Sequence, residues 1–157
     1  FSERIFHVGP GGLGVLMICF GLGAITGAVS VAPLSQSSRP ALLQLIFGTA
    51  FGLFLAGFAL APSFPVALVA LVFVGFNLAA YNALNNTLIM GNTEPRFYGR
   101  VMSIYQITFA VSPFGALPLA WAVEQFGAPI SLALAGLIVA ATVALAGIFY
   151  TPYRHIR

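Results

Sequence analysis

Long apolar stretches separated by short polar connections set the pattern of this chain. Each stretch holds about 20 residues or more, which is enough for a helix to cross a hydrocarbon core of about 30 Å. The stretches are apolar on all sides and about twice the length of a barrel strand, so they predict helices and not a β-barrel. We therefore expect an all-α polytopic membrane protein with five transmembrane helices, at residues 12–34, 41–61, 66–90, 101–123 and 129–151.

The arginines predict how these helices are oriented. If successive spans alternate in direction, five of the 6 basic residues fall on one side of the membrane: Arg39, Arg96, Arg100, Arg154 and Arg157. Cytoplasmic loops retain Lys and Arg, so this side is expected to be the cytoplasm. The carboxyl end is then cytoplasmic and the amino end lies outside.

Composition agrees with lipid as the solvent. Only 6% of the residues are charged and the mean hydropathy is +1.02, whereas a soluble domain has about a quarter charged residues. The net charge of +3 comes from single arginines near helix ends, so no nucleic-acid partner is expected. The chain begins at Phe1, and we expect it to be a piece of a longer protein.

Two short internal similarities predict a repeat. Residues 27–32 resemble residues 115–120, and residues 55–58 resemble residues 145–148, at offsets of 88 and 90 residues. The fourth and fifth spans then repeat the first and second, and the third span begins the second copy. Because three spans separate the copies, they have opposite orientations, which gives an inverted 3+3 repeat as in several secondary transporters. We expect one helix to be missing before Phe1.

Polar side chains gather on the third span. Asn77, Tyr81 and Asn85 form one stripe of a helix, and Asn82 and Asn86 form a second stripe beside it. Polar groups within a bilayer face the bundle interior or a water-filled cavity. Two interpretations stay open: these side chains line a substrate cavity, or they make interhelical hydrogen bonds of about 0.6 kcal/mol each.

The fourth span adds a milder polar face to the predicted cavity, made of Tyr105, Gln106, Thr108 and Ser112. Pro113 and Pro118 interrupt its hydrogen-bond ladder, either as a break that lines a cavity or as a packing kink. In the first two spans, Gly23 and Gly27, and likewise Gly48 and Gly52, have the spacing that predicts close helix packing.

Charged residues at the cytoplasmic connections have two interpretations. Arg39, Glu94, Arg96 and Arg100 are either topogenic charges or a gate that opens and closes as the transporter changes state. Thr93 is expected to cap a short helix that has Pro95 near its start.

The sequence offers no catalytic constellation. It contains no aspartate, its histidines stand close to the two ends of the chain, and its glutamates lie at helix ends or in loops. A hydrolase or metalloenzyme needs a nucleophile with its base, or a cluster of ligands. We expect no enzymatic activity, no metal and no cofactor.

Four segments carry a resemblance to a known family: residues 8–14, residues 20–28, residues 82–87 (Asn-Ala-Leu-Asn-Asn-Thr) and residues 99–103 (Gly-Arg-Val-Met-Ser). They resemble the carboxyl-terminal half of a major facilitator superfamily transporter, from about its eighth to its twelfth helix. The similarity is greatest to the bacterial branch of the enterobactin exporter and macrolide-efflux-like proteins. The chain departs from that family at Tyr98, where a basic residue is usual. It also departs in the loop between the first two spans, which is usually rich in basic residues but here has Ser-Gln-Ser-Ser at 35–38 and only Arg39.

The resemblance implies a secondary transporter of the bacterial inner membrane, which exports amphipathic small molecules by alternating access. It implies that the first, third and fourth spans face the substrate cavity, and that the second and fifth lie outside. The implied partners are the lipid bilayer, the missing amino-terminal half and a small-molecule substrate. The alternative is a non-transporting five-span scaffold or subunit of a membrane complex.

Overall fold

The computed structural model describes residues 10–31, 33 and 39–149, and the side chains of residues 10, 109–113 and 148–149 lie outside the described part. The described chain is helical throughout its regular elements. Its five α-helices are α1 (Pro10–Val31), α2 (Pro40–Ala59), α3 (Phe64–Gly91), α4 (Tyr98–Phe126) and α5 (Ala128–Phe149), with the short 3₁₀ helix η2 (Pro95–Phe97) before α4.

Four of these helices are long and apolar enough to cross a membrane: α1, α2, α3 and α5. They coincide within a few residues with the first, second, third and fifth expected spans. α4 is not among the four, although it extends as one continuous helix through the expected fourth span. The fifth membrane crossing and the repeat layout therefore remain predictions.

Local sequence explains where the helices begin and end. Proline stands in the first helical turn of both α2 and α3, where its missing N–H has no partner to lose. Gly127 has φ of +81°, a conformation that glycine adopts without steric cost, and it separates α4 from α5. Pro113 and Pro118 lie inside α4 and do not divide it.

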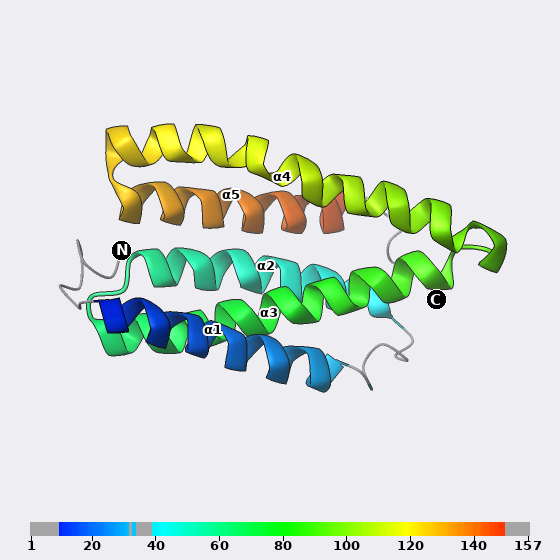
Figure 1. Ribbon diagram of the computed structural model, residues 1–157, viewed down its shortest axis with the longest axis horizontal. Coiled ribbons are helices and arrows are strands. Elements are labelled where there is room, and N and C mark those ends of the chain that lie inside the picture. The colour runs from blue at the N-terminus through cyan, green and yellow to red at the C-terminus, as the bar shows by residue number, and fades with distance from the viewer. Residues whose placement is uncertain (1–9, 32, 34–38, 150–157) are drawn as a thin grey trace.

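The helices form a bundle in which chain neighbours are not always spatial neighbours (Figure 1). α1 packs on α3, α3 on α2, α2 on α5, and α5 on α4. Successive helices run in opposite directions, so the α3–α4 connection, the end of α1 and the start of α2 lie at the same end of the bundle. The described arginines of the connections, Arg39, Arg96 and Arg100, are therefore grouped at that end.

Glycines allow α1 and α3 to approach each other at backbone distance. A Cβ atom on Gly23 or Gly27 of α1 would collide with the carbonyl groups of Val72 or Phe76 of α3. Gly75 of α3 has the same relation to the Phe20 carbonyl of α1. Without a hydrophobic driving force between helices in lipid, such close packing is a main source of association. The prediction of close packing at Gly23 and Gly27 is confirmed.

The second predicted glycine pair also lies at an interface. Gly52 of α2 and Gly136 of α5 each lie against the other's carbonyl oxygen. Gly48 lies next to the ring of Tyr81 on α3 and the side chain of Val143 on α5. α2 is thus held on two sides, by α3 and by α5.

We predict that Gly27→Ala destabilises the natural full-length protein by about 1–3 kcal/mol, because the added methyl group overlaps the α3 backbone and the two helices must separate. Gly21→Ala is the matched control, since a Cβ atom there meets nothing within 4 Å. The control is expected to be neutral or stabilising by up to about 1 kcal/mol, because alanine favours the helix. Thermal unfolding in detergent measures both, and equal effects of the two changes would contradict the packing described here.

Candidate functional site

The structure divides the polar residues of α3 into two groups with different surroundings. Asn77 is only 5% exposed, and its Nδ2 donates to the Phe73 carbonyl of the same helix at 2.7 Å. The ring of Tyr81 lies against Gly48 of α2. This part of the first stripe is directed into the bundle, where it packs between helices.

Asn85, the last member of that stripe, connects three helices through its amide. Its Oδ1 accepts a hydrogen bond from Nε2 of Gln44 on α2 at 2.9 Å, and its Nδ2 donates to the Tyr105 hydroxyl on α4 at 3.1 Å. Gln44 is 7% exposed. We name this chain of hydrogen bonds the Gln44–Asn85–Tyr105 relay.

The relay includes a residue that sequence reasoning did not assign to the site. The family resemblance implies that the second span lies outside the cavity, so the sequence does not assign Gln44 to the site. The available signal was the amide itself, because a polar side chain in an apolar span needs a partner inside the bundle. Which helix supplies that partner depends on the packing of α2 against α3, and sequence alone does not give it.

The second stripe of α3 faces α4 across a pocket. The pocket has a volume of about 350 Å³ and is lined by residues from both helices: Asn82, Asn86, Met102, Tyr105 and Gln106. The Oδ1 atom of Asn86 is buried, and no donor of the described chain contacts it. The pocket combines three amides with the phenol ring of Tyr105 and the thioether of Met102. Such a mixture of polar and apolar groups is found in sites that orient a small molecule.

The remaining predicted cavity residues lie further along α4. Thr108 is exposed and does not line this pocket, and the side chain of Ser112 lies outside the described residues. The structure thus brings together Asn82, Asn86, Tyr105 and Gln106, with Asn85 behind them. Among the described residues, no three His, Cys, Asp or Glu side chains meet in a way that could hold a metal ion.

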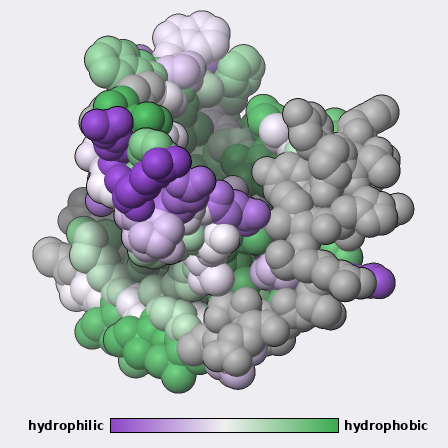
Figure 2. All heavy atoms as spheres, turned by 90° about the vertical axis from the view of Figure 1, so that its right-hand side faces the viewer, coloured by the Kyte–Doolittle hydropathy of each residue, from purple (hydrophilic) through white to green (hydrophobic). Residues whose placement is uncertain are grey.

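The end of the bundle that holds the α3–α4 connection carries a hydrophilic patch beside hydrophobic surface (Figure 2). Arg96 pairs with Glu94 at 2.6 Å and lies over the ring of Phe97 at 4.7 Å. Both partners of the ion pair are largely exposed, at 72% and 64%, so the pair contributes about 0–1 kcal/mol. Because this pair is local to the connection, it does not join α3 to α4. Arg39 is exposed immediately before α2, and Arg100 is exposed in the first turn of α4. A gate role for these four residues remains a prediction.

The short helix expected in this connection is present, but its predicted cap is wrong. η2 begins at Pro95, as expected, with Glu94 at the capping position. The Thr93 hydroxyl instead donates back to the Ile89 carbonyl of α3 at 2.6 Å. Thr93 therefore extends the end of α3, where a carbonyl without a helical partner is available.

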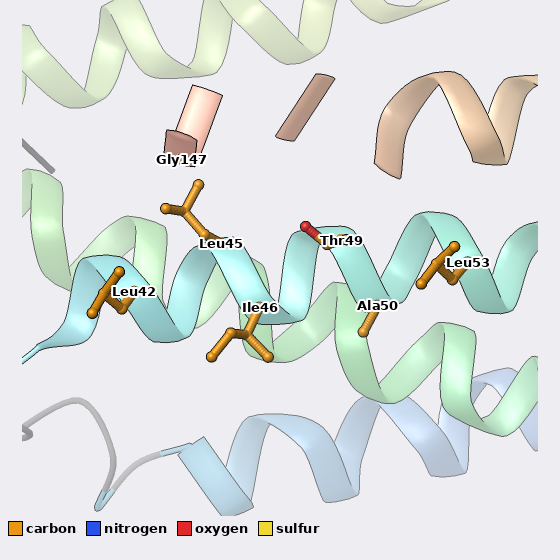
Figure 3. A pocket seen from close by; sticks show the side chains of 7 residues that line it. All are labelled: Leu42, Leu45, Ile46, Thr49, Ala50, Leu53 and Gly147. Atoms are coloured by element: carbon orange, nitrogen blue, oxygen red, sulfur yellow. The ribbon is translucent and has the colours of Figure 1, made fainter. Parts of the chain in front are cut away.

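A second pocket, of about 490 Å³, lies along α2 and is almost wholly apolar (Figure 3). Leu45 extends from α2 toward Gly147 of α5, and Thr49 supplies the one side-chain oxygen among the lining residues. An apolar surface of this kind matches acyl chains but offers few groups that fix a polar ligand. The α3–α4 pocket is therefore the stronger candidate site.

Known proteins that are similar to this chain include one exporter. The enterobactin exporter EntS of Citrobacter koseri is 28% identical over 100 residues, which make up 64% of this chain and 24% of the exporter. The chain thus matches about a quarter of the length of that relative. No solved structure matches the chain. The family model of the Major Facilitator Superfamily matches residues 2–156, and with nearly its whole length covered, the chain belongs to this superfamily.

Proposed function

We propose that this chain is part of a secondary active transporter that exports amphipathic small molecules of the siderophore or drug type by alternating access. The α3–α4 pocket carries the proposal, because polar groups from two membrane helices converge on a space of small-molecule size. Membership of the superfamily supports transport, and the similarity to the enterobactin exporter supports the direction and the class of substrate.

The substrate path in this proposal follows the polar side of α3 and α4. Asn82, Asn86 and Gln106 offer amides to the substrate, and Met102 and the Tyr105 ring offer apolar surface. Asn77 is buried beside this path and bonds its own helix, and the ring of Tyr81 packs against Gly48 of α2. In this proposal, one helix precedes the chain and gives a six-helix half built as an inverted 3+3 repeat. An amino-terminal half then completes the transporter, because midplane substrate sites form where repeats meet.

The alternative of a non-transporting scaffold leaves the polar site unexplained. Apolar packing and glycine contacts, such as those between α1 and α3, are sufficient to hold a helix in a scaffold protein. Packing accounts for the Gln44–Asn85–Tyr105 relay, but not for the amides of Asn82, Asn86 and Gln106 around one pocket. A transported substrate accounts for these amides.

We further propose that the protein lies in the bacterial inner membrane with its carboxyl end in the cytoplasm. Arg39, Arg96 and Arg100 support this orientation, since they share one end of the bundle and cytoplasmic loops retain arginine. Ser63 belongs to the connection at the opposite end.

The orientation predicts a difference in labelling between two exposed positions. In intact cells, Ser63→Cys in an otherwise cysteine-free protein is expected to react with a membrane-impermeant thiol reagent, and Asn92→Cys is expected to resist it until the membrane is permeabilised. Both side chains are exposed, so accessibility within the fold does not separate them. The reverse pattern would invert the proposed topology.

Transport itself predicts saturable uptake of enterobactin into inverted membrane vesicles that contain the natural full-length protein. Gln106→Ala is expected to lower kcat/KM about tenfold, which corresponds to the loss of one hydrogen bond of about 1.4 kcal/mol. Ser103→Ala on the same helix is the control, because its hydroxyl bonds the Gly99 carbonyl and does not line the pocket. If neither enterobactin nor an amphipathic drug enters the vesicles above the level without the protein, the transporter proposal fails.

A further inference from the structure

Tyr105 belongs to the wall of the α3–α4 pocket, and hydrogen bonds connect it to a helix outside that pocket. Its hydroxyl accepts from Asn85 Nδ2 at 3.1 Å, and Asn85 Oδ1 accepts from Gln44 Nε2 at 2.9 Å. The residues that line the pocket belong to α3 and α4, whereas Gln44 belongs to α2. Gln44 is therefore linked to the pocket through Asn85 and not by lining it.

Asn85 keeps one amide orientation because both ends of its amide are bonded. The torsion that turns a terminal amide is broad and roughly two-fold, so steric contacts alone select its orientation weakly. The bond from Gln44 directs the Asn85 oxygen toward α2, and the nitrogen is thereby turned toward Tyr105. Without Gln44 the amide is free to turn over, and the Tyr105 hydroxyl loses a donor that is held in place.

Gln44 is itself held by a well-fixed helix. Its side chain is 7% exposed, and hydrogen bonds are electrostatically stronger where water is excluded. One turn further along α2, Gly48 lies against the ring of Tyr81 on α3 and the side chain of Val143 on α5. Because α2 packs on both α3 and α5, the donor group of Gln44 starts from a backbone that neighbours support on two sides.

The far end of the relay lies where the pocket wall needs support. α4 packs on α5, and its side toward α3 borders the pocket. Met102 and Gln106 flank Tyr105 on α4 and line the same pocket. A change in the placement of the Tyr105 ring therefore changes the surface that a ligand in the pocket meets.

From these contacts we infer that Gln44 is a positioning residue for the α3–α4 pocket, because it fixes the Asn85 amide that holds Tyr105 in the pocket wall. The inference rests on the proposed function, since that function assigns the pocket to the substrate. It adds that a residue of α2, a helix that does not line the pocket, controls how tightly the substrate is bound. A residue that served stability alone would change neither the surroundings of Tyr105 nor the KM for substrate.

A fluorine label on Tyr105 tests the relay without any substrate. Meta-fluorotyrosine is incorporated at position 105 of the natural full-length protein, and fluorine NMR spectra are recorded in detergent. The fluorine stands next to the hydroxyl on the ring, so its resonance depends on the hydrogen bond that the hydroxyl accepts. Gln44→Met removes the amide and keeps the length of the side chain. We expect it to shift the resonance in the same direction as Asn85→Leu, which removes the direct partner of Tyr105.

Two further variants make this measurement decisive. Thr49→Val is the matched control, because Thr49 lies on the same helix but lines the apolar pocket along α2; the resonance is expected to stay in place. Gln44→Asn keeps an amide in α2 but is one methylene shorter, so its nitrogen no longer reaches Asn85 Oδ1, and we expect a shift like that of Gln44→Met. It replaces Gln44→Met if that variant does not fold. An unchanged resonance in a folded Gln44 variant would overturn the inference.

Uptake of enterobactin into inverted vesicles supplies a second measurement. Gln44→Met is expected to raise KM about threefold and to leave kcat nearly unchanged, because a less firmly held Tyr105 weakens binding in the ground state and the transition state alike. A purely structural loss would lower the amount of active protein, and with it the maximal rate, at the same KM. Thr49→Val is expected to keep the original KM. An unchanged KM in Gln44→Met would also contradict the inference.

The inference and the transporter proposal can fail separately. Enterobactin uptake together with an unmoved Tyr105 resonance leaves the transporter standing and removes the positioning role. A resonance that shifts in the Gln44 variants, in a protein that moves neither enterobactin nor an amphipathic drug, leaves the positioning of Tyr105 standing and removes the proposed transport.

Discussion

The backbone contact between α1 and α3 is the interaction on which the rest of the bundle depends. Glycines from both helices meet the carbonyl groups of the other, so the two axes lie closer than side chains would permit. This contact fixes α3 along one side, and the approach of α2 fixes it along another. The rotation of α3 is then set, and its second polar stripe is turned toward α4. In lipid, apolar side chains gain little free energy by packing against one another. The close backbone contact therefore determines much of which helix packs against which.

Much of the fold was predictable because a bilayer imposes a length and a polarity on each span. Four expected helices appear as spans, and proline and glycine mark several of their ends. The end of α3 was less predictable, because Thr93 could either cap the next helix or bond back to its own. The structure shows the second, since the Ile89 carbonyl is within reach and lacks a helical donor.

The candidate site was predicted in composition but not in arrangement. Helical periodicity places Asn82 and Asn86 on a different stripe from Asn77 and Asn85, but it does not say which stripe faces which helix. That depends on the spatial order of α1, α3, α2, α5 and α4, which differs from the order along the chain. The same spatial order brings Gln44 next to Asn85, and the residues around Gln44 in the sequence do not predict the hydrogen bond between them.

The Gln44–Asn85–Tyr105 relay has a consequence for how this protein can change during evolution. Gln44 and Tyr105 do not bond each other, yet each depends on opposite ends of one amide. A substitution of Gln44 leaves the Asn85 amide free to rotate. The hydrogen bond from Asn85 to the Tyr105 hydroxyl is then no longer held in place, although Tyr105 itself is unchanged. Substitutions at the two outer positions should therefore be epistatic, so that natural variants replace the three residues as a set and seldom one at a time.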